Sequence, residues 1–174
     1  PDTRQLIDEL IGGQPLSDDY LRFLVTELKP FIDANYDTRT GRDHTFLLGS
    51  SMGGLISMYG VQEYPEVFGG AACLSTHWPA VFGEGQQPEA VTHMLDRLAE
   101  RMAPLHEHRW YFDYGTTELD AVYEQFQLPV DARLRELGYA EGKTWLTRKY
   151  EGAGHAERYW RERVHIPLRF LLGK

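Results

Sequence analysis

The sequence is poor in cysteine, in long apolar runs and in clustered basic residues. Its single cysteine, Cys73, has no partner for an internal disulfide, which excludes a disulfide-stabilised scaffold. No apolar run approaches the roughly 20 residues that a membrane-spanning helix requires. The 18 basic residues are outnumbered by 26 acidic ones, which gives a net charge of −8 with histidine neutral. This balance argues against a nucleic-acid partner and against binding to an anionic membrane surface.

Strand-like and helix-like patterns alternate along the chain. A length of 174 residues, of which 42% are hydrophobic, suits one domain with a single core over 1–174. Short apolar runs at 45–48, 71–74, 109–114 and 144–150 are typical of buried strands. Helical spacing of apolar residues predicts helices over 17–32, 55–65, 91–102, 121–137 and 157–172. The alternation indicates an α/β fold whose sheet, of about four strands, is mostly parallel.

The ends and interruptions of these helices also follow from single residues. We expect Ser17 to cap the first helix, because its hydroxyl would accept a hydrogen bond from a free amide of the first turn. Pro30, Pro129 and Pro167 lie inside predicted helices. Proline lacks a backbone N–H, so we expect each to kink or interrupt its helix.

The segment Gly49-Ser50-Ser51-Met52-Gly53 matches the pattern G-x-S-x-G, with Ser51 at its centre. An apolar strand comes before it and an apolar-periodic helix follows, which is the context of a nucleophile elbow. In such an elbow the serine hydroxyl projects above the sheet at a sharp turn from strand into helix. The Met52 backbone N–H would then point at a developing oxyanion. A glycine-rich turn with an idle serine is the alternative.

A serine becomes a nucleophile when a histidine takes its proton and a carboxylate orients that histidine. In this architecture the acid, and then the histidine, follow the serine along the chain. His155 ends the segment Gly152-Ala153-Gly154-His155, between the last predicted strand and the last predicted helix. A base belongs on such a loop at the carboxyl end of the sheet, so we predict His155 as general base. The alternative is an exposed loop histidine.

Three carboxylates are candidates for the orienting acid, namely Asp113, Glu118 and Asp120. Asp113 lies inside the third predicted strand, where its side chain points across the sheet rather than over its end. Glu118 and Asp120 lie in the following loop, where an orienting acid belongs. Local sequence does not separate these two.

Other histidines have weaker claims to a role. His77 and Trp78 follow the second predicted strand, and either line a substrate pocket or form an ordinary loop pair. His106 and His108 form an H-x-H pair, but no further ligand-type residues lie near them at metal-binding spacing. We therefore expect these two side chains to be solvated rather than to bind a metal.

Five segments carry a resemblance that runs from about Leu28 to the C-terminus. They read Leu-Gly-Ser-Ser-Met-Gly-Gly at 48–54, Tyr-Pro-Glu-Val-Phe-Gly-Gly at 64–70, Ser-Thr-His-Trp at 75–78, Tyr-Phe-Asp-Tyr-Gly-Thr at 111–116 with Leu-Asp-Ala at 119–121, and Tyr-Glu-Gly-Ala-Gly-His at 150–155. This ordered set resembles the esterase family that includes enterochelin esterases, feruloyl esterases and mycolyltransferases. Within that family it is most similar to the enterochelin esterase-like hydrolases.

The resemblance implies an α/β-hydrolase fold with Ser51 as nucleophile and His155 as base. Members similar to this chain carry Leu-Asp-Ala after the Gly-Thr pair, which matches Asp120. Feruloyl esterases and mycolyltransferases place an acid three residues past that glycine, which matches Glu118. On this resemblance Asp120 is the expected acid and Glu118 the substitute.

The chain departs from the family at its N-terminal side. Full-length relatives have further strands before the helix that begins at Ser17, and a loop among them donates the second oxyanion-hole N–H. The chain therefore resembles the C-terminal portion of such an esterase, with the N-terminal strands of the family missing. In the family's sheet order one of those strands flanks the strand that ends at Ser51. Here we expect an open apolar edge, which tends to pair with another chain.

The sequence thus predicts a serine esterase that hydrolyses a small-molecule carboxylic ester through an acyl-enzyme, without a cofactor or metal. We expect no nucleic-acid or membrane partner, and we expect a homo-oligomer or pairing through the exposed sheet edge. One alternative is an acyltransferase, which shares the covalent intermediate and differs in its acceptor. The other is a truncated homologue that is catalytically impaired or depends on a partner.

Overall fold

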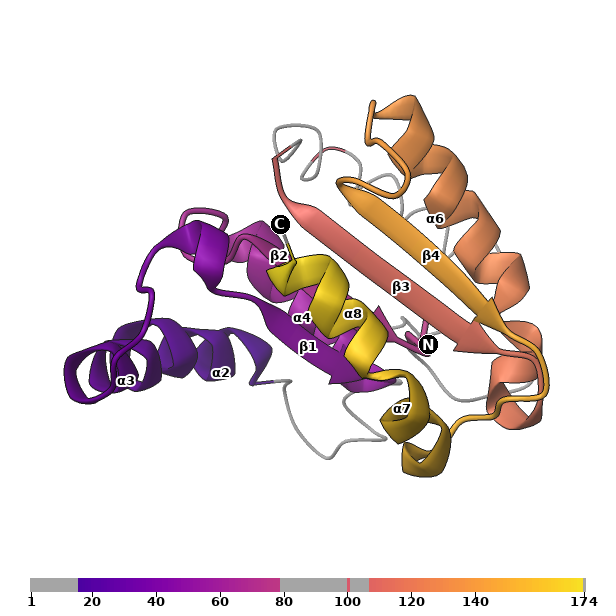
Figure 1. Cartoon of the computed structure of the whole chain (residues 1–174), viewed down its shortest axis with the longest axis horizontal. Helices are drawn as coiled ribbons and strands as arrows, with labels where there is room; N and C mark the ends of the chain where they lie inside the picture. Colours follow the sequence, from indigo (N-terminus) through magenta and orange to yellow (C-terminus); the bar gives the residue numbers. More distant parts are fainter. Residues whose placement is uncertain (1–15, 79–99, 101–106, 174) are drawn as a thin grey trace, which may run out of the picture. The chain divides into compact units, whose positions relative to one another are not determined.

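The computed structural model describes residues 16–78, 100 and 107–173. The chain packs as two compact units, residues 1–40 and 41–174. The described part of the first unit is helical, and the described sheet lies entirely in the second (Figure 1). No helix within the described ranges is long and apolar enough to cross a membrane.

Within the described residues the sheet has four parallel strands in the order β1-β2-β3-β4. Their bounds are Leu47–Ser50 for β1, Gly70–Leu74 for β2, Arg109–Gly115 for β3 and Trp145–Tyr150 for β4. Every residue of the central strand β2 is buried, as expected for a parallel sheet with both faces covered. These are the four strands predicted from the apolar runs, and the prediction is confirmed.

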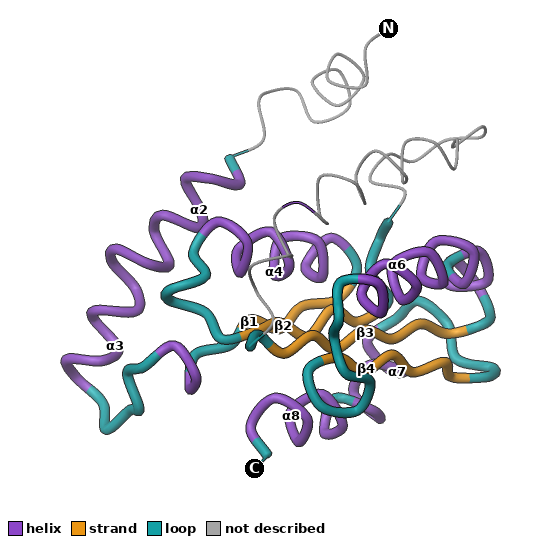
Figure 2. Tube along the Cα trace, turned by 90° about the horizontal axis from the view of Figure 1, so that it is seen from above, coloured by secondary structure: helices purple, strands orange, loops and turns teal. Residues whose placement is uncertain are grey.

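Helices cover both faces of this sheet (Figure 2). Helices α4 (Met52–Glu63) and α6 (Glu124–Glu136) lie on one face, and α8 (His165–Leu172) lies on the other. On the α8 side, Leu171 packs in a buried cluster with Leu74 of β2 and Tyr111 of β3. The short helices η2 (Arg42–His44), η3 (Glu118–Val122) and α7 (Glu157–Arg163) complete the described part of the unit. The predicted α/β class with a parallel sheet is confirmed.

The helical unit shows how a chain passes a proline without breaking. Helix α2 (Ser17–Phe23) runs through a π-helical turn, η1 (Leu24–Leu28), directly into α3 (Lys29–Asn35). Pro30 therefore does not end the helix. In the wider π turn just before it, the carbonyls are not arranged to need the N–H that proline lacks, and there is room for the proline ring. The predicted cap is also wrong, since Ser17 is the first helical residue and its side chain makes no capping hydrogen bond.

The other two prolines act differently from each other. Pro129 lies inside α6, which continues past it without interruption. The final predicted helix is divided at Val164 into α7 and α8, with Pro167 in the first turn of α8. This break fits the clash of a proline ring with the carbonyl four residues earlier, here that of Arg163. The helix predicted over 91–102 lies outside the described residues, apart from residue 100.

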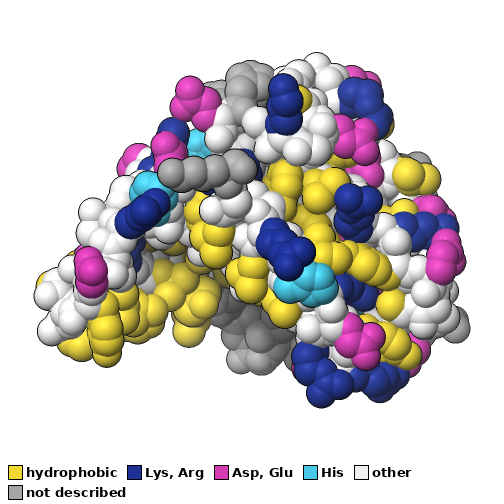
Figure 3. Space-filling view, in the orientation of Figure 1, with side chains coloured by type: hydrophobic (Ala, Val, Ile, Leu, Met, Phe, Trp, Pro, Cys, Tyr) yellow, Lys and Arg dark blue, Asp and Glu magenta, His cyan; other side chains and the backbone are white. Residues whose placement is uncertain are grey.

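Large apolar side chains are exposed on the described helices of the first unit: Leu16, Tyr20, Phe23, Leu28, Phe31 and Tyr36. Figure 3 shows apolar side chains gathered over α2 and α3.

The cysteine of the sheet unit is buried. Cys73 lies inside β2 and is 0% exposed. Burial, with a smaller contribution from the charge of Asp113, raises the pKa of its thiol far above the usual range. The thiol therefore stays protonated in the folded protein.

Candidate active site

Ser51 lies at the sharp turn between β1 and α4. Its backbone has φ 57° and ψ −122°, a region that non-glycine residues rarely occupy. The turn is held from outside, because the Ser51 N–H donates to the Leu74 carbonyl of β2 over 2.9 Å. Gly49 has to be glycine, since a Cβ there would lie 2.3 Å from the Gly53 carbonyl oxygen. Strain that neighbouring contacts maintain in this way is a frequent property of catalytic turns.

Met52 is the first residue of α4. The first amide groups of a helix have no partner inside it, and they lie at the positive end of the helix dipole. The Met52 N–H is therefore suited to stabilise negative charge beside the Ser51 hydroxyl. This is the position that the sequence predicted for an oxyanion donor.

The loop that carries His155 does not stay above its own strand. After β4 it turns across the end of β3, where the N–H groups of Thr116 and Thr117 donate to the Ala153 carbonyl over 2.9 and 3.0 Å. The crossing is close, because a Cβ on Gly115 would lie 2.1 Å from that same oxygen. Glycine at 115 thus lets the loop pass over β3 and carries His155 toward β2.

His155 meets Asp120 at this point. The Nδ1 atom of His155 lies 2.6 Å from Oδ1 of Asp120, whose side chain is 0% exposed. Burial alone would raise the pKa of Asp120, but hydrogen bonds from His155, Ser75 and the Gly115 N–H outweigh burial and lower it. An ionised carboxylate only accepts hydrogen bonds, so Nδ1 carries the proton and Nε2 is left to accept one.

The other two candidate carboxylates bind different groups. Glu118 accepts a hydrogen bond from the His155 backbone N–H over 3.1 Å and pairs with Arg158. It therefore fastens the histidine loop rather than the imidazole ring. Asp113 lies inside β3, fully buried, and forms an ion pair with Arg163 in which Nη2 and Oδ1 are 2.8 Å apart. Of the three carboxylates, Asp120 is the one that contacts the ring.

Ser51 and His155 both follow the carboxyl ends of strands, β1 and β4, and lie at the same end of the sheet. A chain of three contacts links them: the His77 N–H donates to the Ser51 carbonyl over 3.3 Å, His77 Nδ1 lies 2.6 Å from the Tyr123 hydroxyl, and the rings of Tyr123 and His155 are 5.6 Å apart. In the described part of the chain no hydrogen bond joins the Ser51 hydroxyl to His155. Such bonds are often long before substrate is bound.

His77 and Trp78 have separate surroundings. Burial, and then the neighbouring His155, lower the pKa of His77, so its imidazole stays neutral beside Tyr123. Trp78 is 2% exposed, with its ring against Phe112 and its indole N–H donating to Gln127 over 3.0 Å. These contacts place Trp78 in the core of the unit, and a role for His77 and Trp78 in binding substrate stays a prediction.

Three residues to which the sequence assigned no part in the triad connect to Asp120. Ser75 is 0% exposed, and its hydroxyl lies 2.5 Å from Asp120 Oδ2. Trp160 and Arg163 both donate to that hydroxyl over 2.9 Å. A signal for Arg163 was present, since it lies three residues after Trp160 on the apolar side of the final helix. A charged residue at such a position usually has a buried partner.

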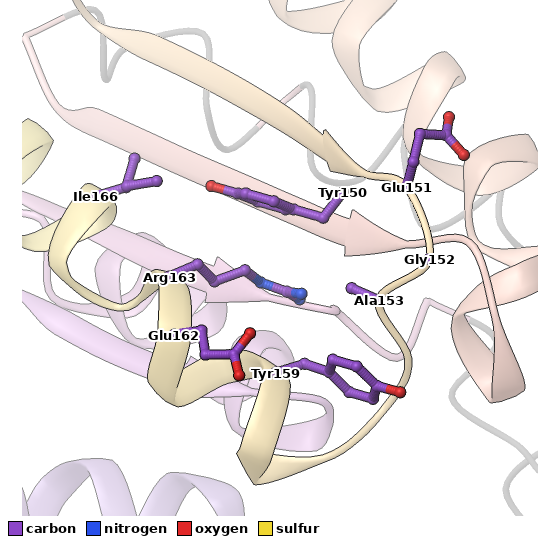
Figure 4. A pocket seen from close by; sticks show the side chains of 8 residues that line it. All are labelled: Tyr150, Glu151, Gly152, Ala153, Tyr159, Glu162, Arg163 and Ile166. Carbon is purple, nitrogen blue, oxygen red and sulfur yellow. The ribbon is translucent and has the colours of Figure 1, made fainter.

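A cavity of about 360 Å³ opens between the loop after β4 and α7 (Figure 4). Eight residues line it: Tyr150, Glu151, Gly152, Ala153, Tyr159, Glu162, Arg163 and Ile166. Ser51, Asp120 and His155 do not line it. The guanidinium of Arg163 lies against the Tyr150 ring, 4.7 Å from its centre. The cavity thus adjoins the Arg163 side of the acid rather than the serine.

Metal ligands do not gather anywhere in the described residues, where no group of three or more His, Cys, Asp or Glu side chains could hold an ion. Of the H-x-H pair, His106 lies outside the described residues. His108 is 4% exposed and its Nε2 lies 2.9 Å from the Pro65 carbonyl oxygen. The expectation that His108 is solvated is therefore wrong, because the side chain hydrogen bonds to the backbone inside the unit.

Comparisons with known proteins agree with the fold described above. The model of the family described as "Putative esterase" matches residues 5–170. The uncharacterised protein YbbA of Bacillus subtilis is 25% identical over 162 residues, which cover 89% of this chain and 60% of YbbA. A ferulic acid esterase superposes with a TM-score of 0.66 at 22% identity, covering 87% of this chain and 60% of that chain. The enterobactin esterase FES of Shigella flexneri does so with a TM-score of 0.70 at 22% identity, covering 88% and 37%. The chain thus spans 60% or less of the length of these proteins.

Proposed function

The chain belongs to this esterase family, and we propose that it is a serine hydrolase that cleaves carboxylic esters. Ser51 is the nucleophile, His155 the general base and Asp120 the acid that orients the base. One observation carries the proposal: the 2.6 Å contact between His155 Nδ1 and Asp120 Oδ1, made at the same sheet edge as the strained turn of Ser51. Nucleophile, base and orienting acid are the three parts that acyl transfer requires.

The reaction proceeds through an acyl-enzyme. The Ser51 hydroxyl attacks the ester carbonyl carbon while Nε2 of His155 takes its proton. The buried carboxylate of Asp120 stabilises the resulting imidazolium and stays ionised throughout. The Met52 N–H stabilises the negative charge on the carbonyl oxygen. The tetrahedral intermediate then releases the alcohol, which takes the proton from His155, and a water molecule hydrolyses the acyl-enzyme by the same steps.

A second proposal concerns β1, the strand at the side of the described sheet. Among the described strands β1 pairs with β2 alone, and Leu48 on it is 43% exposed. An unpaired apolar edge is a template for another strand. We propose that a second copy of the chain pairs along β1, next to the nucleophile.

The acyl-enzyme also allows an alternative reaction, in which an alcohol replaces water in deacylation. Product analysis with and without added alcohol separates this acyl transfer from hydrolysis.

A fluorophosphonate probe tests the main proposal directly, because it reacts covalently with an activated serine. The intact protein should be labelled, and Ser51→Ala should abolish both labelling and ester hydrolysis. Ser50→Ala is the matched control, since it removes the neighbouring hydroxyl of the same turn and should leave labelling in place. Unlabelled protein beside a reacting serine hydrolase, or a labelled Ser51→Ala variant, would contradict the assignment.

A further inference from the structure

The hydroxyl of Ser75 has three partners in the core. It lies 2.5 Å from Asp120 Oδ2, 2.9 Å from Trp160 Nε1 and 2.9 Å from Nη2 of Arg163. Ser75 is 0% exposed, so water does not compete for these bonds. The direction of each bond follows from the chemistry of the partners. An indole N–H and a guanidinium N–H can only donate, so they occupy both lone pairs of the hydroxyl oxygen. Its single proton therefore points at Asp120.

In this arrangement the two carboxylate oxygens of Asp120 have different partners. Oδ2 accepts from Ser75 and from the Gly115 N–H over 2.7 Å, whereas Oδ1 faces His155. With Oδ2 fixed twice, the carboxylate plane has little freedom to rotate. The position of Oδ1, and with it the tilt of the imidazole ring, is then set from the core.

Ser75 itself is held by the ion pair behind it. Its backbone N–H donates to the Asp113 carbonyl over 2.8 Å and to the Asp113 carboxylate over 3.1 Å, and Arg163 bridges that carboxylate and the Ser75 hydroxyl. Its backbone has φ 42°, a strained value for a residue other than glycine. A strained conformation persists only where surrounding contacts over-determine it. The strain and the contacts both indicate that the orientation of the hydroxyl is fixed by the fold.

We propose that Ser75 is a positioning residue, which acts through Asp120 to hold His155 in the geometry for proton transfer. The inference rests on the proposed function, because it assigns Asp120 and His155 to the same pair. It adds a fixed donor behind the acid, so that a chain of buried groups runs from Asp113 through Arg163 and Ser75 to Asp120.

Two substitutions separate the hydroxyl from the strain. Ser75→Gly removes the hydroxyl and accommodates φ 42° without strain, whereas Ser75→Ala removes the hydroxyl and keeps the strain. Ser57→Ala is the matched control, since Ser57 is also buried but its hydroxyl donates to the Gly53 carbonyl of its own helix. Both Ser75 variants should lower kcat by about 10–100-fold with KM nearly unchanged, because a misplaced base affects the chemical step. Ser57→Ala should keep kcat within about twofold.

The pH profile gives a readout that a loss of packing would not move. Without the donor, the Asp120 carboxylate attracts the imidazolium proton more strongly, so the acid limb of kcat/KM should move to higher pH in Ser75→Gly. An unchanged profile and kcat in folded Ser75→Gly would overturn the proposal. A defect in Ser75→Ala alone would also overturn it, since strain would then be the cause.

An NMR measurement keeps the test independent of activity. The proton on His155 Nδ1 reports its hydrogen bond to Asp120, and its resonance should shift and exchange faster with water in Ser75→Gly than in Ser57→Ala. If the protein proves not to hydrolyse esters, this resonance still decides whether Ser75 positions the pair. If Ser75→Gly does not fold, Trp160→Phe removes the indole donor. Because the Trp160 ring also packs against the His155 ring, 5.1 Å between centres, the readout in this variant is the exchange of the Nδ1 proton with water, which should be faster than in Ser57→Ala. An exchange rate of this proton that both variants leave unchanged would overturn the inference.

Discussion

The two halves of the proposed catalytic edge are built differently. The acid–base half consists of Ser75, Asp113, Asp120, His155 and Arg163, and the side chains of Asp113, Asp120 and Arg163 are 0%, 0% and 4% exposed. The nucleophile half consists of β1, Ser51 and the start of α4, where Leu48 and Met52 are 43% and 48% exposed. Hydrogen bonds and an ion pair in the core fix the first half, whereas an edge strand and a strained turn carry the second. Buried contacts thus fix the geometry of the base, whereas that of the nucleophile rests on a strained backbone held by the bond from the Ser51 N–H to Leu74, beside exposed side chains.

The largest expected effect lies in the acid–base half. Asp120→Asn should lower kcat on the order of 10⁴-fold, because an amide neither selects the Nδ1-protonated tautomer nor stabilises the imidazolium. Steady-state hydrolysis of an aryl ester measures the loss. Asp131→Asn is the control, since Asp131 is a partly buried carboxylate that binds Gln127 and Thr147 away from His155. An Asp120→Asn variant with a tenth of the wild-type kcat would show that the pair is not catalytic.

The ion pair behind the acid should dominate stability. Arg163→Met leaves the carboxylate of Asp113 buried without its partner, which should lower the free energy of unfolding by about 3–5 kcal/mol. Urea denaturation measures the change. Arg22→Met removes an exposed pair with Asp19, whose side chains are 63% and 55% exposed, and should have an effect below about 1 kcal/mol. Similar losses in both variants would remove the distinction between buried and exposed pairs.

The two glycines of the nucleophile turn should behave differently. Gly49→Ala places a Cβ 2.3 Å from the Gly53 carbonyl oxygen, so it should destabilise the fold by about 1–3 kcal/mol. A Cβ on Gly53 meets nothing within 4 Å, and Gly53→Ala should stabilise α4 by up to about 1 kcal/mol. Urea denaturation of both variants compares them within one motif. Equal effects would mean that the turn is not as tight as the structure has it.

Acid should weaken the acid–base half in a predictable direction. Because hydrogen bonds lower the pKa of Asp120 in the folded chain, the unfolded chain takes up the proton first, and the stability that Asp120 adds is lost as the pH falls from about 5 through its folded pKa. Burial raises the pKa of Asp131, so its contribution to the free energy of unfolding has the opposite sign. That contribution becomes more favourable to the folded state as the pH falls. The difference in unfolding free energy between wild type and Asp120→Asn should therefore shrink toward low pH, while that for Asp131→Asn should change in the other direction.

The smallest effect concerns the open edge. Leu48→Lys should weaken self-association about tenfold, which corresponds to about 1.4 kcal/mol, because a charge on an edge strand opposes pairing. Leu128→Lys alters a similarly exposed leucine on α6 and should leave association unchanged. Sedimentation velocity over a range of concentrations measures both. Unchanged association of Leu48→Lys would place the contact elsewhere, and a monomer at all concentrations would exclude pairing.

The sheet could be predicted from the sequence because buried parallel strands read as continuous apolar runs. All four strands were found in this way. The helices were predicted less well at their prolines, because Pro30 follows a π turn that no local pattern records, and α6 continues past Pro129. Hydrophobic patterning thus located the strands, but it did not show where a helix continues through a proline.

The candidate site divides in the same way. Ser51 and His155 were found through their local context, and their catalytic roles stay predictions. Asp120 and Glu118 lie in one short helix, η3, but Asp120 is buried against the ring of His155 whereas Glu118 is more exposed and bonds to its backbone. Ser75 and Arg163 were missed because their meaning depends on contacts between segments about 90 residues apart in the chain.

The buried thiol of Cys73 can be used to measure how often the sheet opens. A protonated sulfur in the central strand, 0% exposed, can react with an alkylating reagent only when the sheet opens. The rate of alkylation therefore counts opening events in the strand that lies between the nucleophile and the rest of the sheet. With one cysteine in the chain, every modified molecule reports that single place.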